Sequence, residues 1–109
     1  MPVQVRLSLP IKEIMQTIYK YELEVVDDQV LMLPLGAQIL TVQLQYGKPV
    51  LWAVVDLPKR ALLPVTIKTY GTGIATHDNL DRADYVGTYQ LNEGHLVFHV
   101  FSNCGINVN

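Results

Sequence analysis

The sequence contains one cysteine, Cys104, and no strongly basic segment. A single cysteine cannot form an internal disulfide, so the fold does not depend on an oxidising compartment, and a cytoplasmic setting is the simpler expectation. Eight Lys and Arg residues against ten Asp and Glu residues give a net charge of −2, and only Lys59-Arg60 places two basic residues together. Because phosphate binding needs a clustered basic face, we expect no nucleic-acid partner.

Long apolar runs are also missing. Pro, Gly or charged residues interrupt every apolar run well before the roughly 18 residues that a membrane-spanning helix requires. Residues 1–14 carry Arg6 and Lys12 among alternating apolar residues, with no continuous apolar segment before a small-residue cleavage site. We therefore expect neither a membrane span nor a signal peptide.

Hydrophobic residues, in contrast, are abundant. They make up 50% of the 109 residues while charged residues make up 17%, a balance far from the composition of disordered proteins. The length suits one domain with one modest core.

Short segments of alternating or β-branched apolar residues predict a chain made of strands. The clearest runs from Thr17 to Val26, and the others cover residues 3–9, 30–33, 39–46, 50–55, 65–70, 85–91 and 95–101. Turn residues separate these segments at short intervals. We expect an all-β (mainly β) fold, a small antiparallel meander that forms a sandwich or a partly open barrel. At most one short helical turn is expected, near Asp78 to Ala83 and capped by Asp78.

Two of these segments predict which side chains face the core. In residues 39–46 we expect the even positions to point inward, before a turn at Gly47-Lys48-Pro49; these positions are Leu40, Val42, Leu44 and Tyr46. The run from Val50 to Val55 is apolar throughout, which is typical of a central strand covered on both faces. Periodicity alone leaves a buried helical segment open for this run.

The segment Asn92-Glu93-Gly94 predicts a hairpin between the last two strands. A two-residue turn at Glu93-Gly94 produces an apolar face through the pairs Leu91 with Leu96, Tyr89 with Phe98, and Gly87 with Val100. A three-residue turn sets Thr88 opposite Phe98 instead. Because a one-residue slip moves a whole face between core and solvent, we favour the first register.

A candidate ligand site follows from this register. His99 would lie opposite Thr88, on a face shared with Gln90 and with the apolar residues Val86, Val97 and Phe101. A glycine-rich turn after the preceding strand could offer backbone N–H groups beside this face. We predict that the site comprises Tyr70, Gly71, Thr72, Gly73, Thr88, Gln90 and His99. A glycine-rich segment is more often an ordinary turn, and a histidine in this position is more often a partly buried residue hydrogen-bonded to Thr88 or to the backbone.

No metal site, cofactor or catalytic residue is predicted. His95 and His99 lie on one strand face about 13 Å apart at roughly 3.3 Å per residue, whereas zinc ligands converge to about 2 Å from one ion. The loop residues His77 and Asp78 do not begin a calcium-binding pattern. Cys104 follows the last predicted strand, and no serine stands in a G-x-S-x-G turn. A non-enzymatic protein is therefore favoured.

Six segments carry a resemblance to a known group of proteins. They are Thr17-Ile18-Tyr19-Lys20-Tyr21, Pro34 to Gln45, Trp52-Ala53, Tyr70-Gly71-Thr72-Gly73, Tyr85-Val86-Gly87-Thr88-Tyr89-Gln90 and Leu96-Val97-Phe98-His99-Val100-Phe101. From about Met15 onward the chain resembles a family of small, uncharacterised proteins of tailed bacteriophages and prophages. The resemblance implies a β domain over residues 15–102, with residues 1–14 as an N-terminal extension or an added strand. Residues 103–109 are expected to form a frayed tail.

The resemblance implies a context but no activity. The expected function is that of a non-enzymatic phage or prophage accessory protein that acts by binding, for example by interfering with a host defence or regulatory component. A minor structural or assembly protein, whose strand edges pair with other subunits, is the alternative. A small hydrolase or nucleotide-processing enzyme would require the Gly71–Gly73 turn and His99 to meet in one cleft.

The expected partners are a second copy of the chain, a host protein or a small metabolite. Self-association is expected because the strands are short and apolar, and because Val50 to Val55 carries no charge that would protect an edge. A symmetric dimer is the commonest closed arrangement.

Overall fold

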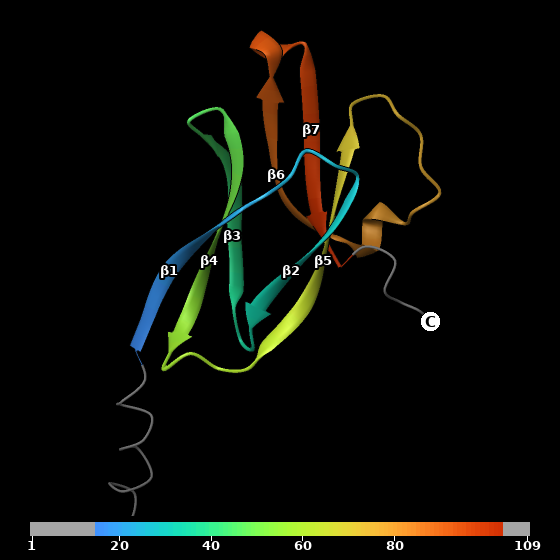
Figure 1. Ribbon diagram of the computed structural model, residues 1–109. Helices are drawn as coiled ribbons and strands as arrows, with labels where there is room; N and C mark the ends of the chain where they lie inside the picture. Colours follow the sequence, from blue (N-terminus) through green and yellow to red (C-terminus); the bar gives the residue numbers. More distant parts are fainter. Residues whose placement is uncertain (1–14, 104–109) are drawn as a thin grey trace, which may run out of the picture.

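Seven β-strands make up most of the described part of the chain, residues 15–103, in the computed structural model (Figure 1). Two short 3₁₀ turns accompany them. In chain order the elements are β1 (Met15–Glu22), β2 (Asp28–Pro34), β3 (Gln38–Gln45), β4 (Lys48–Leu57), β5 (Leu62–Gly71), η1 (Leu80–Arg82), β6 (Asp84–Leu91), η2 (Asn92–Gly94) and β7 (Leu96–Ser102).

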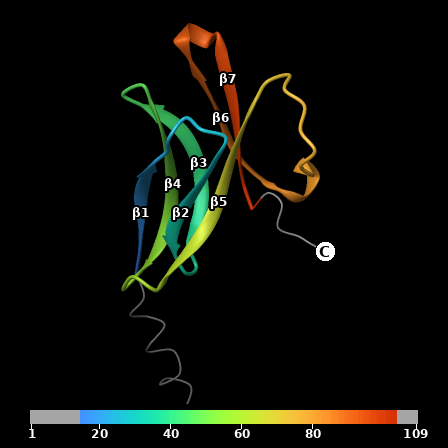
Figure 2. The ribbon, with the colours of Figure 1, turned by 45° about the vertical axis from the view of Figure 1, so that its right-hand side comes forward.

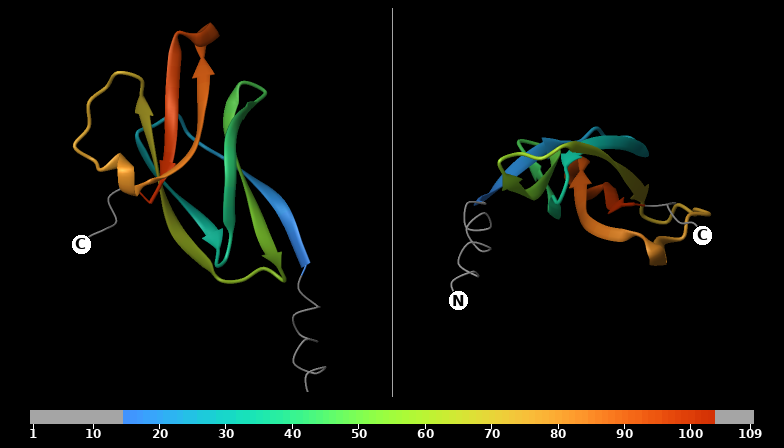
Figure 3. Two further views of the ribbon diagram at one scale, coloured as in Figure 1. Left: turned by 180° about the vertical axis from the view of Figure 1, so that it is seen from behind. Right: turned by 90° about the horizontal axis from the view of Figure 1, so that it is seen from below.

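The strands form two antiparallel sheets. One sheet has three strands in the order β1-β4-β3, and the other has four in the order β2-β5-β7-β6. The two sheets lie as separate layers and do not close into a barrel (Figures 2 and 3). This arrangement confirms the predicted all-β sandwich. Within residues 15–103, no helix is long and apolar enough to cross a membrane.

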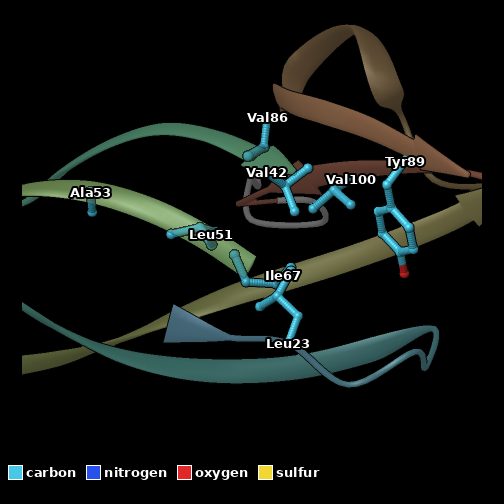
Figure 4. Close-up of a cluster of buried hydrophobic side chains, with 8 residues drawn as sticks. All are labelled: Leu23, Val42, Leu51, Ala53, Ile67, Val86, Tyr89 and Val100. Atoms are coloured by element: carbon cyan, nitrogen blue, oxygen red, sulfur yellow. The ribbon is translucent and has the colours of Figure 1, made fainter. Parts of the chain in front are cut away.

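The core lies between the two layers (Figure 4). Each sheet contributes side chains from its inner face, since alternate residues of a strand point to opposite sides. The buried cluster consists of Leu23, Val42, Leu51, Ala53, Ile67, Val86, Tyr89 and Val100.

Strand β4 is the centre of the three-stranded sheet, as its apolar sequence predicted. It is paired with β1 on one side and with β3 on the other. The segment from Val50 to Val55 is therefore not a free edge, so its lack of charge does not support self-association. The strands at the sheet margins are β1 and β3 in one sheet and β2 and β6 in the other.

The predicted inward face of β3 is wrong for most of its residues. A bulge lies between Ile39 and Thr41, and a bulge shifts all preceding side chains to the other face. Ile39 therefore packs against the core together with Val42, while Leu40 is exposed. Leu44 follows the bulge on the same face as Val42, but it lies near the end of the strand and is also exposed. Tyr46 is 96% exposed because it lies in the turn itself.

The turn after β3 also differs from its prediction. Gln45 pairs with Lys48, so the two residues between them, Tyr46 and Gly47, form the turn. Both have positive φ values, 53° and 77°. Two consecutive positive φ values are the mark of the type I′ turn that suits a tight hairpin. Lys48 and Pro49 already belong to β4.

The hairpin of β6 and β7 has the predicted register. Leu91 pairs with Leu96, Tyr89 with Phe98, and Gly87 with Val100. A bulge between Tyr85 and Gly87 was not predicted, and it turns Val86 into the core. Val86 therefore does not share the face of His99.

Gly87 lies where β6 comes close to β3 of the other sheet. A Cβ atom placed on Gly87 would lie 2.8 Å from Val42 Cγ1, 3.1 Å from Val42 O and 3.2 Å from Val42 N. Two of these atoms are backbone atoms, which cannot rotate away. The absence of a side chain at Gly87 thus permits the contact between these strands of different sheets.

The predicted helical turn is present, but its cap is a different residue. η1 is a single 3₁₀ turn, and the Asn79 side chain accepts a hydrogen bond from the Asp81 backbone N–H. Asp78, the predicted cap, interacts with β5 instead.

Two predicted segments lie outside the described residues. They are the strand over residues 3–9 and the tail from residue 104 onward. The last described residue, Asn103, donates its backbone N–H to Thr66 O at 3.0 Å.

Candidate functional site

The outer face of the four-stranded sheet carries a row of polar side chains. Tyr70 on β5, His99 on β7 and Thr88 on β6 are directly paired across the three strands. Their neighbours Thr69 and Val100 are buried on the inner side. Because strand side chains alternate, the row faces away from the core.

His99 is held by hydrogen bonds at both ring nitrogens. The Thr72 hydroxyl lies 2.7 Å from Nε2, and the Thr88 hydroxyl lies 2.9 Å from Nδ1. The Tyr85 hydroxyl lies 2.6 Å from that of Thr88. A neutral imidazole has one donor and one acceptor nitrogen, so the direction of one bond determines the direction of the other. Four side chains, from β6, β7 and the loop after β5, thus form one continuous hydrogen-bonded chain.

An open depression of about 300 Å³ lies beside this chain. Its lining residues come from the end of β5, the loop between β5 and η1, η1 itself, β6 and β7. The loop between β5 and η1 is seen at the right of Figure 1. The residues that line it are Tyr70, Gly71, Thr72, Gly73, Ile74, Thr76, Leu80, Tyr85, His99 and Phe101. The glycine-rich turn and His99 therefore meet in one hollow.

The structure brings together most of the predicted site residues. The turn from Tyr70 to Gly73 lines the depression with His99, and Thr88 reaches it through its bond to His99. Gln90 does not line it; the side chain lies near Gly94 at the end of the hairpin, 3.3 Å from where a Cβ on that glycine would stand. Val97 does not line this depression either.

The aromatic side chains beneath the depression support one another. The Phe101 ring lies edge-on to Tyr70 at 5.7 Å and to Tyr85 at 5.5 Å between centroids. Edge-to-face pairs of this kind add to the stabilisation from burial. Tyr85 was missed as a site residue because the bulge that follows it cannot be read from the pattern. Leu80 could have been predicted as a lining residue of the site, since it is an apolar residue within a polar loop.

Asp78 anchors the loop to the sheet. Its carboxylate accepts hydrogen bonds from the Tyr70 hydroxyl at 2.5 Å and from Lys68 Nζ at 3.4 Å. The Tyr70 bond, and then those from Lys68 and Thr76, hold the pKa of Asp78 below its ordinary value. Lys68 also pairs with Asp28 at 3.2 Å. The hydrogen bond that Lys68 donates to the Asp28 carboxylate is the main reason why the pKa of Lys68 is raised.

A larger hollow, of about 420 Å³, has no comparable chemistry. It lies between the β2–β3 turn and the start of β6, and its lining is mostly apolar. Asp84 and Tyr85 are the only titratable side chains among the described residues that line it. We therefore place the candidate site at the smaller depression.

The described residues contain no group of three or more His, Cys, Asp and Glu side chains that could hold a metal ion.

Two side-chain oxygens in the core have no hydrogen-bond partner among residues 15–103. They are the hydroxyl oxygens of Thr69 and Tyr89. Burial raises the pKa of Tyr89.

Comparison with known proteins adds a family. A family model matches residues 15–106, and its description is a domain of unknown function (DUF7352). The match begins at the first residue of β1 and includes every residue that lines the depression. No curated protein and no solved structure matches the chain.

Proposed function

Because the chain belongs to the DUF7352 family, whose description states no activity, we propose a function from the site itself. The protein acts by binding, and the depression beside His99 receives an uncharged, largely apolar group of a small molecule or a peptide. The observation that carries this proposal is the fixed His99 side chain, bonded at both nitrogens, at the wall of an apolar hollow.

The lining determines the kind of ligand. Ile74, Leu80 and Phe101 offer apolar surface, while Thr72 and His99 offer hydrogen bonds. Ligand sites commonly combine an apolar lining with a few polar groups that orient the ligand. No Lys, Arg, Asp or Glu is among the described lining residues, so the lining provides no charge to neutralise a charged ligand. The volume is near the lower end of ligand pockets, which suits a group such as one aromatic or aliphatic side chain.

The biological role that we propose is that of a phage or prophage accessory protein. The support is the sequence resemblance from Met15 onward, and the concrete form is binding to a host defence or regulatory component in the host cytoplasm. An assembly protein is the second candidate, favoured by the marginal strands β1 and β2. Genome neighbourhood separates the two, because early accessory genes favour the first and head or tail genes favour the second.

Self-association is part of the second candidate. Unpaired strand edges can pair with another copy, most simply in a two-fold dimer. Sedimentation of the full chain at high micromolar concentration would show a dimer. A monomer under those conditions would contradict the assembly role.

The binding role is tested with the full chain and a library of small uncharged fragments. Fragments that bind at the site should shift the NMR signals of Gly73 and Tyr85 in the unaltered protein. The shifts should be lost in His99→Ala and Thr72→Ala variants that remain folded. His95→Ala is the matched control, since His95 lies outside the depression, and it should bind normally. Binding that is unchanged in both site variants would show that the site is wrongly placed.

A further inference from the structure

The bond between Thr72 and His99 has the geometry of an activated hydroxyl. Thr72 Oγ1 lies 2.7 Å from His99 Nε2, within the reach at which a histidine takes a proton from a nucleophile. Thr88 holds the other nitrogen at 2.9 Å, as the third member of a catalytic triad does. From this geometry we propose that Thr72 is a nucleophile that accepts an acyl group from an uncharged carboxylic ester. This inference rests on the proposed binding role of the same depression.

The lengths of the hydrogen bonds indicate where the Thr72 proton lies. The hydroxyl has a second acceptor, the carbonyl oxygen of Val97, but at 3.5 Å. Hydroxyl hydrogen bonds are usually near 2.7–2.8 Å and weaken as they lengthen. In the proposed nucleophile, the Thr72 hydroxyl therefore donates to Nε2, the nearer of the two acceptors. The other nitrogen then carries the ring proton and donates a hydrogen bond to the Thr88 hydroxyl oxygen. The hydroxyls of Thr88 and Tyr85 are in turn hydrogen-bonded to each other.

The backbone next to Thr72 has the second feature that acyl transfer requires. Gly73 has a positive φ of 83°, and its N–H donates to no acceptor among residues 15–103. In hydrolases with an exposed nucleophile on a sharp turn, the N–H of the following residue stabilises the oxyanion. Thr72 itself is exposed, so an ester can reach it.

The proposed reaction has two steps. In the first, the Thr72 oxygen bonds to the ester carbonyl carbon as the Thr72 proton passes to His99 Nε2. The bond from this carbon to the alcohol oxygen then breaks, and the proton on Nε2 passes to the leaving alcohol. In the second, water bonds to the acyl carbon as it gives a proton to Nε2. The bond from the acyl carbon to the Thr72 oxygen then breaks as that proton passes from Nε2 to this oxygen, which releases a carboxylic acid and restores both Thr72 and His99. The apolar lining, with Ile74, Leu80 and Phe101, suits an aliphatic or aromatic acyl group.

Each residue has a separate role in this reaction. Thr72 and His99 are catalytic residues, since they touch the reacting atoms. Thr88 is a positioning residue, because it acts only through the imidazole. Its removal should slow acylation without changing the binding of the ester.

The experiment uses the full chain and p-nitrophenyl hexanoate as the probe. We expect a burst of p-nitrophenolate and a hexanoyl group on Thr72, located by mass spectrometry of peptides. Thr72→Val should abolish the label at this position, and Thr72→Ser should keep it. His99→Asn should slow acylation by about 100-fold or more, the usual size of a general-base contribution. Thr88→Val should lower the maximal rate of the burst phase while leaving unchanged the ester concentration at which that rate is half-maximal. His95→Asn should have no effect.

Two outcomes would overturn the proposal. One is a protein that carries no acyl group on Thr72; the other is acylation of Thr72 at an unchanged rate in His99→Asn. The corresponding hexanoic anilide, which cannot readily transfer its acyl group, separates this failure from that of the binding role. If the anilide shifts the NMR signals of the depression but Thr72 is not acylated, only the covalent step is refuted. If neither occurs, both proposals are refuted for this ligand class.

Discussion

Replacing Gly87 by Ala tests the contact that holds the two sheets together. The new methyl group would lie 2.8 Å from a Val42 side-chain carbon and 3.1–3.2 Å from two backbone atoms of the same residue. The side-chain carbon could rotate, but the backbone atoms could be relieved only by moving β6 away from β3. We therefore expect Gly87→Ala to destabilise the protein.

The magnitude follows from two opposed effects. Forcing a methyl group into a well-packed core usually costs about 1–3 kcal/mol. Replacing glycine by alanine in a strand raises the free energy of unfolding by about 0.5–1 kcal/mol, because the unfolded chain then has less conformational entropy to lose on folding. The net loss is then about 1–2 kcal/mol. For a domain of this size it corresponds to a fall of about 4–16 °C in the unfolding midpoint.

Thermal and urea unfolding of the full chain would measure this loss. Gly47→Ala is the matched control, since a Cβ there meets nothing within 4 Å and its cost comes only from a positive φ. In a Val42→Ala background, Gly87→Ala should cost less than it does in the unaltered protein, but still a measurable amount, since the backbone contacts remain. A Gly87→Ala variant as stable as the unaltered protein would refute the close approach of β3 and β6.

Three further predictions concern other parts of the molecule. The pKa of Asp78 is lowered in the folded state, chiefly by the hydrogen bond from Tyr70. The Asp78 carboxylate therefore stabilises the folded protein at pH values above its ordinary pKa of 3.8. This stabilisation is lost as the pH falls through the lower pKa of the folded state. Asp78→Asn should thus be less stable at pH 7 in urea unfolding, and the difference should close below about pH 4. Tyr89→Phe removes a buried hydroxyl that has no partner within residues 15–103, so the free energy of unfolding should stay unchanged or rise by about 1 kcal/mol at most. A clear fall in urea unfolding would contradict this. Deleting residues 1–14, which precede the family match, should lower the midpoint by less than about 8 °C, and a larger fall would show that this segment stabilises the domain.

The alternating pattern predicted the fold class well because alternation reports directly on strand burial. The hairpin register could be predicted because only one pairing sets Tyr89 and Val100 on a shared apolar face. The bulges near Leu40 and Val86 could not, because each inserts one residue without leaving a mark in the pattern. For the site, the sequence predicted that the glycine-rich turn would approach His99, but not that Tyr85 would complete the hydrogen-bonded chain.

The order of the strands has a consequence for how the chain folds. β1 and β2 are neighbours in sequence, yet they belong to different sheets and pair only with β4 and β5 (Figure 1). During synthesis on the ribosome, neither early strand has its partner until the later strands have emerged. Such non-local pairing slows folding and leaves apolar strands exposed in the meantime. The nascent chain should therefore depend on chaperones more than a helical protein of the same length does.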